Sequence, residues 1–219
     1  MGAMVVCRGS LFLSLAVLLA GCIPSPDAPP KRPEAAKAAL PNNPEILACM
    51  SDLARAGAHF SLLPDYYAGH CSATNAIKLV SIGIPITNLG ATRCGTARIF
   101  AGWIHAPVRK AAREVFRKSV IQVETMGSYS CRNVKGTASN RLSEHAFANA
   151  VDVSGFILSD GRRITVETGW SGDEDAARFL RLIRDAACQR FSTVLSPDYN
   201  AAHYNHLHFD MADTKPYCR

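Results

Sequence analysis

The 219-residue sequence lacks several features that would point to common classes of protein. It has no Cys-x-x-Cys pair, which argues against a cysteine-rich metal site. Its Lys and Arg residues are scattered, with no basic run interleaved with aromatic residues, so the formal charge of +6 predicts no nucleic-acid partner. No internal repeat is visible, and no apolar run after residue 22 is long enough for a transmembrane helix.

The first residues have the pattern of a bacterial targeting segment. Arg8 supplies the positive charge, and the apolar run 11–20 is too short to span a bilayer as a mature helix. Leu19-Ala20-Gly21-Cys22 resembles a lipobox, which predicts a lipoprotein signal peptide over residues 1–21 and a lipid on Cys22; the alternative is an ordinary secretory signal cleaved nearby. Ile23 follows the cysteine in place of Asp, so lipoprotein sorting predicts a periplasm-facing outer-membrane lipoprotein.

Two further segments follow. Residues 22–44 contain seven of the 12 prolines, with Ala and Lys between them, and this composition predicts a stiff, extended tether. Residues 45–219 are long enough for one domain with its own core.

The cysteines predict disulfides. Cys7 is lost with the signal peptide and Cys22 is used by the lipid. Six remain in the domain: Cys49, Cys71, Cys94, Cys131, Cys188 and Cys218. An even number in an exported chain predicts three disulfides. Three of the six precede residue 100, so at least one bridge must join the two halves into one stapled domain.

Helix signals mark three stretches of the domain. Asn43-Pro44-Glu45 caps a helix that is expected to end near Gly57. A helical stretch is expected over 92–118, with Pro107 bending or splitting it. The capping-box spacing of Ser171-Gly172-Asp173-Glu174 predicts a third helix that ends near Arg190.

Strands are expected over 77–82, 84–89, 120–126, 150–158, 163–167, 193–195 and 206–211. The pair 150–158 and 163–167 forms a hairpin around Asp160-Gly161. Helices interleaved with hairpin strands predict an α+β fold, an antiparallel sheet with flanking helices.

Three of the seven histidines, His203, His206 and His208, lie within six residues near the C-terminus. Residues 206–210 alternate polar and apolar, which is typical of a half-buried strand, so both of its histidines and Asp210 share one face. Asp210 either orients an imidazole or caps the strand.

His145 and Asp152 lie seven residues apart upstream, and Asp152 stands between two valines. Burying a carboxylate there costs free energy unless it is paired or binds a cation. His, Asp and His are the ligand types of a catalytic zinc site, which leaves a fourth position open to water and lowers that water's pKa to about 7.

The pattern Ser-x-His-(x)6-Asp followed by His-x-His resembles the zinc peptidases of the lysostaphin, D-Ala-D-Ala peptidase and murein endopeptidase group, whose fold the hedgehog signalling domain shares. Across residues 45–219 the chain more closely resembles the bacterial extensin-like C-terminal domain family. The motifs that carry this closer resemblance are Gly-Ser-Tyr-Ser-Cys-Arg-Asn at 127–133, Arg-Leu-Ser-Glu-His at 141–145, Val-Asp-Val-Ser-Gly-Phe at 151–156, Phe-Leu-Arg at 179–181, Cys188, Val-Leu-Ser-Pro-Asp-Tyr-Asn-Ala at 194–201 and His-Leu-His-Phe-Asp at 206–210.

The resemblance to the zinc peptidases implies a hedgehog or D-Ala-D-Ala peptidase-like fold and zinc on His145, Asp152 and His208. It implies further roles for three catalytic-site residues: His206 assists the attacking water, His203 is a further active-site histidine, and Arg132 contacts substrate, unless it is only part of a structural ion pair.

Two departures from that group affect its base. Ala148 stands where the D-Ala-D-Ala branch usually has Gly, and the Glu-x-x-Trp-His motif is missing. The base is therefore expected to be His206, with Glu144 ranked second. Trp103, Trp170 and the remaining histidines are expected to be ordinary packing or surface residues.

These inferences predict a lipid-anchored zinc metallopeptidase that cleaves peptidoglycan peptide stems, as an endopeptidase or a carboxypeptidase, in cell-wall remodelling. The alternative is a non-catalytic, murein-binding or structural envelope lipoprotein of the same fold. The open zinc position favours the enzyme, because a binding module has no need of it.

Overall fold

The computed structural model describes residues 43–135 and 140–219, which belong to one unit that spans Lys37–Arg219. The predicted signal peptide, the lipidated Cys22 and nearly all of the predicted tether lie outside the described residues. Within the described part of the chain, no helix is both long and apolar enough to cross a membrane.

The described residues confirm an α+β fold with largely antiparallel sheets. The first helix, α1 (Pro44–Arg55), begins where predicted, because the Asn43 side chain accepts a hydrogen bond from the Glu45 backbone N–H at 2.9 Å. A three-stranded sheet in the order β1-β4-β6 follows, formed by β1 (Ala58–Leu62), β4 (Ala76–Ile82) and β6 (Ala91–Arg93). A separate hairpin, β2 (Tyr66–Ala68) and β3 (Cys71–Ala73), lies between β1 and β4 in the chain.

A seven-stranded sheet carries the strands β8 and β11. Its strands run in the order β12-β10-β11-β8-β7-β5, and β9 pairs with β8. Their bounds are β5 (Ile86–Thr87), β7 (Val120–Gly127), β8 (Ala150–Leu158), β9 (Arg163–Thr165), β10 (Thr193–Leu195), β11 (Leu207–Asp210) and β12 (Tyr217–Cys218). The sheet is mixed at its edges, since β5 is parallel to β7 and β12 is parallel to β10.

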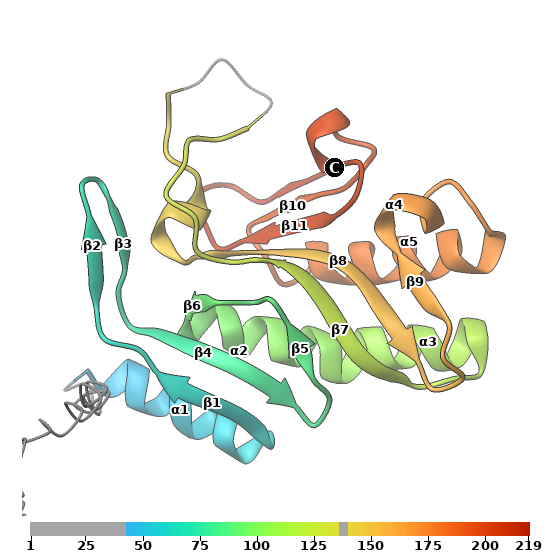
Figure 1. The fold of residues 1–219 in the computed structure, drawn as a ribbon, viewed down its shortest axis with the longest axis horizontal. Helices are drawn as coiled ribbons and strands as arrows, with labels where there is room; N and C mark the ends of the chain where they lie inside the picture. The colour runs from blue at the N-terminus through green and yellow to red at the C-terminus, as the bar shows by residue number, and fades with distance from the viewer. Residues whose placement is uncertain (1–42, 136–139) are drawn as a thin grey trace, which may run out of the picture. The chain divides into compact units, whose positions relative to one another are not determined.

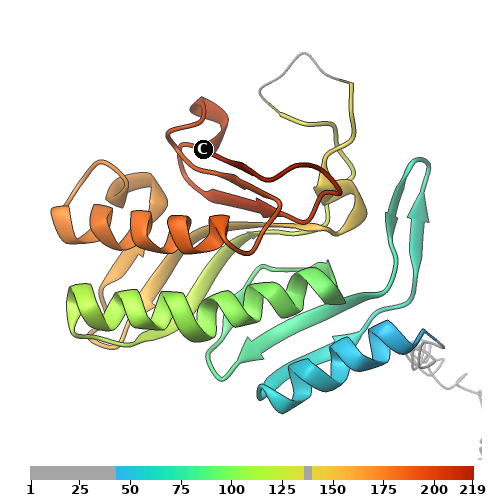
Figure 2. The same cartoon turned by 180° about the vertical axis from the view of Figure 1, so that it is seen from behind.

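Helices cover one face of this sheet (Figures 1 and 2). They are α2 (Cys94–Trp103), the π-helical turn η1 (Ile104–Val108), α3 (Arg109–Phe116) and α5 (Glu174–Cys188). Pro107 lies inside η1, so the expected interruption of the long helix is confirmed. Trp103 is fully buried between these helices and the sheet: its ring centroid lies 4.9 Å from that of Phe209 on β11, and its Nε1 donates to the Ile183 carbonyl.

Several predicted boundaries were wrong. The strand expected over 84–89 is limited to β5, and the helix expected from residue 92 begins at Cys94, because 91–93 form β6. The strand expected over 163–167 ends at Thr165, because the Thr165 hydroxyl accepts from the Thr168 N–H and starts the short helix α4 (Val166–Gly169). The cap of α5 is Asp173 and not Ser171, because the residue directly before the first helical turn is the one whose carboxylate reaches the Ala176 N–H, at 3.0 Å.

All six domain cysteines form disulfides, as predicted: Cys49–Cys94, Cys71–Cys131 and Cys188–Cys218. The bridge Cys71–Cys131 joins the parts of the chain before and after residue 100. It attaches the β2–β3 hairpin to the segment that carries Arg132, and so holds two regions of distant sequence together beside the sheet.

Candidate metal centre

The loop before β8 places the first candidate ligand. The short 3-10 helix η2 (Glu144–Phe147) is capped by the Ser143 hydroxyl, which accepts from the His145 backbone N–H at 3.4 Å. Ala148 ends the helix in the left-handed conformation, with φ of 54°. That conformation is one that Gly adopts most easily, so Ala148 is a non-glycine residue in a backbone conformation that usually favours glycine. The reversal turns the chain directly into β8.

The other two candidate ligands face each other across a strand pair. β8 and β11 are antiparallel, and His208 is the register partner of Asp152. Residues that alternate with them, Val151 and Phe209, are fully buried in the core beneath. One face of the sheet is therefore apolar and covered by helices, and the other carries the polar cluster.

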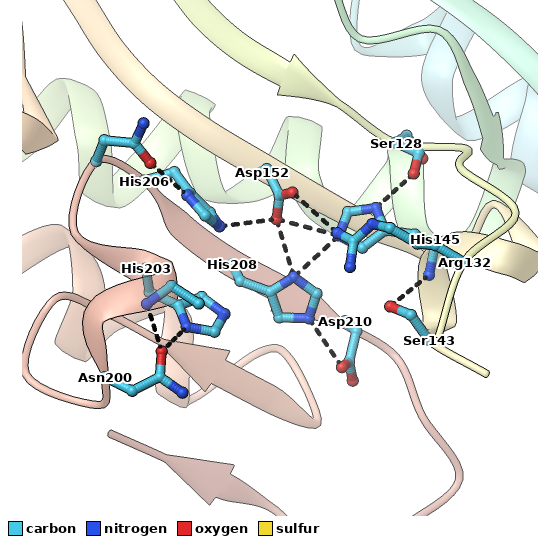
Figure 3. A network of polar contacts seen from close by, with 12 residues as sticks. Ser128, Arg132, Ser143, His145, Asp152, Asn200, His203, His206, His208 and Asp210 are labelled. Carbon is cyan, nitrogen blue, oxygen red and sulfur yellow. Dashed lines mark hydrogen bonds and ion pairs between the residues drawn. The ribbon is translucent and has the colours of Figure 1, made fainter. Parts of the chain in front are cut away.

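Three ligand atoms converge at this point (Figure 3). His145 Nε2 lies 3.1 Å from Asp152 Oδ1 and 3.1 Å from His208 Nδ1, and His208 Nδ1 lies 2.9 Å from Asp152 Oδ1. All three residues are buried. Tetrahedral zinc, with ligand distances of about 2.0–2.2 Å, would separate such atoms by roughly 3.3 Å, close to the separations observed.

The outer hydrogen bonds fix the protons of the two imidazoles. His145 Nδ1 contacts the Ser128 carbonyl oxygen, which can only accept, so the proton of this ring is on Nδ1 and its Nε2 carries a lone pair. His208 Nε2 lies 3.1 Å from Asp210 Oδ2, which likewise places the ring proton on Nε2 and a lone pair on Nδ1. Two lone pairs and a carboxylate oxygen thus face one another, and this donor set fits a cation.

The pKa shifts of His208 and Asp152 also indicate that the cluster stabilises positive charge. Burial alone would lower the pKa of His208, but its hydrogen bonds to Asp152 and Asp210 outweigh burial and raise that pKa to about 9. Burial alone would raise the pKa of Asp152, yet its polar contacts with the His145 and His208 rings hold it well below its usual value. Without a metal, a second proton on His208, bound to Nδ1 in place of the lone pair of the neutral ring, supplies the charge that the cluster requires.

His206 lies beside the three ligands without joining them. Its Nδ1 lies 2.9 Å from Asn205 Oδ1, an acceptor, so its proton is on Nδ1 and its Nε2 is free to accept. That Nε2 lies 3.7 Å from Asp152 Oδ1. Burial, reinforced by the neighbouring imidazoles, lowers the pKa of His206. A neutral imidazole with its lone pair toward the centre has the form that a general base needs.

His203 forms a second layer. It ends the 3-10 helix η3 (Ala201–His203), its Nδ1 lies 2.8 Å from Asn200 Oδ1, and its ring centroid lies 5.1 Å from that of His206. Burial, with the nearby His206 and His208, lowers the pKa of His203 to about 4, so this ring is neutral at ordinary pH.

The structure shows the contacts of Asp210, Arg132 and Glu144. Asp210 accepts from His208 through Oδ2 and from the Ala212 N–H through Oδ1, so it both orients the imidazole and caps the strand. Arg132 Nη2 lies 3.7 Å from Asp152 Oδ2, and Arg132 also lines the cleft above the centre. Glu144 is bound elsewhere, since its Oε2 accepts from Asn149 Nδ2 at 2.7 Å.

The centre lies in a cleft of about 900 Å³, a volume typical of ligand sites. The wall formed by the segment after β7 carries three cationic side chains: Arg132, Lys135 and Arg141. Tyr204 and Tyr217, which line the cleft from the C-terminal segment, are 55% and 41% exposed, so the cleft combines positive charge with open aromatic surface.

Sequence reasoning missed the residues that hold the histidines. Ser128, Asn200 and Asn205 each accept from a ring nitrogen, and Asn149 joins three elements. Its Nδ2 donates to Glu144 and to the Met211 carbonyl, and its Oδ1 accepts from the Thr96 hydroxyl at 2.7 Å. The one signal in the sequence for these four residues was that they lie close to the histidine motifs. Ser and Asn are common in any loop, so their presence alone does not indicate a role in the site.

Fold and site together define an α+β protein with a buried His-Asp-His cluster at the floor of an open cleft. The family model described as extensin-like protein C-terminus matches residues 47–219, and the chain belongs to that family. No curated protein and no solved structure matches the chain.

Proposed function

We propose that this protein is a zinc-dependent peptidase that acts on the peptide stems of peptidoglycan. The observation that carries the proposal is the convergence of three lone-pair donors, from His145, Asp152 and His208, in a cleft that is open to substrate. Two nitrogens and one oxygen are ligands that zinc accepts, and three protein ligands leave a position for chemistry. Zinc bound there would supply a Lewis acid that activates water and polarises a carbonyl group.

The remaining side chains have distinct tasks in this proposal. His206, neutral and with Nε2 unprotonated, takes a proton from the attacking water and returns it to the leaving amine. Asn205 holds its tautomer. His203 keeps a second neutral ring against His206, and Arg132 binds a carboxylate or the developing oxyanion of the substrate.

The relation to the D-Ala-D-Ala and murein endopeptidase group, with its hedgehog-like fold, belongs to the same proposal. It rests on the shared order of His145, Asp152 and His208 and on their grouping at one face of an antiparallel sheet. The absence of the Glu-x-x-Trp-His motif, together with the hydrogen bond from Asn149 to Glu144, supports His206 as the base.

The cellular setting is proposed from the N-terminal sequence. The lipobox-like Leu19-Ala20-Gly21-Cys22 and the proline-rich residues 22–44 support a lipid anchor and a tether at the periplasmic face of the outer membrane. Three disulfides are consistent with an oxidising compartment of this kind.

The experiment is digestion of purified sacculi by the mature domain, with products separated by chromatography. We expect release of peptide fragments that stops with a chelator and returns with zinc. His206→Ala should lower kcat far more than it changes KM, whereas Arg132→Ala should mainly raise KM. If zinc-loaded protein binds sacculi but releases no fragment, the alternative function, a non-catalytic murein-binding lipoprotein, would be correct instead.

A further inference from the structure

A second, smaller hollow adjoins the cleft of the metal centre. It has a volume of about 280 Å³ and lies where β8, β9 and α4 meet. Met126 and Asn205 line both hollows, so they form the boundary that the two share. Met126 is 53% exposed and its side chain therefore does not close the passage with a packed wall.

The sheet geometry relates this hollow to the metal centre. Ser154, which lines the small hollow, stands two residues after Asp152 on β8, so both side chains point to the same face of the sheet. Two residues of strand span roughly 7 Å, and an extended substrate advances at the same rate. An extended peptide that follows β8 past the metal centre would therefore reach the hollow about two residues from the cleaved bond.

The charges at the two ends of this combined groove differ. The large cleft carries Arg132, Lys135 and Arg141 on one wall. In the small hollow Arg163 is the only cation among the lining residues that the structure describes, and its Nε is paired with Glu124 Oε2 at 2.7 Å. Glu167 adds a carboxylate to the same hollow. A terminal carboxylate would be repelled there, whereas neutral amides, hydroxyls or an amine would be accepted.

The hydrogen-bonding groups of the small hollow are mostly hydroxyls. The Thr165 and Thr168 side chains bond to each other at 2.7 Å, and the Thr165 hydroxyl also accepts from the Thr168 N–H. Each hydroxyl keeps one further donor or acceptor position after these bonds. Such groups suit a peptide backbone that passes through, and they do not suit a site that grips one charged end.

We propose that the substrate is an extended peptide that crosses the metal centre, with a carboxylate-bearing part on the Arg132 side and a neutral or amine-bearing part in the small hollow. This inference rests on the proposed function and deepens it. The cationic cleft of about 900 Å³ has room for more than one terminal residue, and the small hollow extends the groove on the other side, so the groove fits an endopeptidase that cuts an internal bond better than a carboxypeptidase that releases a terminal residue.

The test uses the zinc-loaded mature domain with two probes, a peptide-cross-linked muropeptide dimer and an uncross-linked monomer with a free C-terminal carboxylate. Thr168→Trp fills the small hollow from its exposed rim. Arg178→Trp places the same indole on an exposed position of α5 as the control. Zinc binding of each variant reports whether the metal site has folded.

We expect the wild type to cut the dimer at an internal bond. Thr168→Trp should lower kcat/KM on the dimer at least tenfold with zinc binding unchanged, while Arg178→Trp should stay within twofold of wild type. Glu167→Lys, which reverses charge without filling the hollow, should lower dimer cleavage and raise the relative rate on the monomer.

Three results would count against the inference. Release of only the terminal residue of the monomer by wild type would overturn the endopeptidase assignment and keep the peptidase. Equal dimer cleavage by wild type, Thr168→Trp and Glu167→Lys would overturn the role of the small hollow. No cleavage of either probe by zinc-loaded protein would overturn the proposed function, and the inference with it.

Discussion

Asp210→Asn should weaken zinc binding without unfolding the site. In the wild type, Asp210 Oδ2 accepts from His208 Nε2 at 3.1 Å, and Oδ1 accepts from the Ala212 N–H at 3.1 Å. Asn keeps an oxygen for the backbone contact but removes the charge that fixes the His208 tautomer. Loss of an outer-shell partner of this kind costs 10- to 100-fold in metal affinity, equivalent to about 1.4–2.7 kcal/mol.

The assay is competition between metal-free protein and a chromophoric chelator, with thermal unfolding of the metal-free protein as the stability readout. Asp210→Ala provides the comparison, because it removes both contacts and should also lower stability by about 1 kcal/mol through the lost cap. Wild-type zinc affinity in Asp210→Asn would refute the reasoning that the outer hydrogen bond prepares His208 as a ligand.

Three further predictions follow from single features of the structure. Unreduced, denatured protein should show almost no free thiol, and two or more reactive thiols in the wild type would contradict the pairing. The double variant Cys71→Ala/Cys131→Ala should lose about 4 kcal/mol of unfolding free energy in urea, because that bridge joins residues 60 positions apart in the sequence. In metal-free protein, the contribution of His208 to the free energy of unfolding should be complete below pH about 6.5 and should fall as pH rises from there to about 9, because its folded pKa is raised to about 9. The measurement is the difference in urea midpoint between wild type and His208→Ala at each pH. A difference that stays constant across this range would show that the folded protein does not stabilise the imidazolium. Asn149→Ala should weaken zinc binding several-fold and lower the free energy of unfolding by about 1–3 kcal/mol, because the side chain that links η2 to the end of β11 is lost. Asn140→Ala, at an exposed position, serves as the control. Equal zinc affinity and stability of the two variants would show that Asn149 does not position the site.

Local signals in the sequence predicted the long elements well. Asn43 followed by Pro44 marked the start of α1, and Pro107 marked the interruption between α2 and α3, because both effects act within one helical turn. The strict alternation over 207–210 predicted which side chains of β11 face the core and which face the cluster.

The short and distant pairings could not be predicted. β12 consists of two residues that pair in parallel with β10, and β2 and β3 have three residues each, too few for a hydrophobic period to be recognised. The small hollow beside Met126 arises because β9 and α4 pack beside β8, and no local sequence pattern in those segments predicts it.

The pattern of candidate ligands was visible in the sequence, but its support was not. The residue types and the resemblance to the zinc peptidases brought His145, Asp152 and His208 into one hypothesis, and the structure places their donor atoms within 4.8 Å of one another. The carbonyl of Ser128 and the side chain of Asn205, which decide the tautomers, depend on tertiary contacts that have no sequence signature.

Metal analysis of four variants tests the central claim most directly. After zinc loading and gel filtration, the account predicts one zinc per chain in the wild type and in His206→Ala. It predicts none in His145→Ala, Asp152→Ala and His208→Ala, because each loses one of three converging donors. Metal-free wild type would contradict the site itself, and zinc retained in His208→Ala but lost in His206→Ala would reverse the roles given to the two histidines.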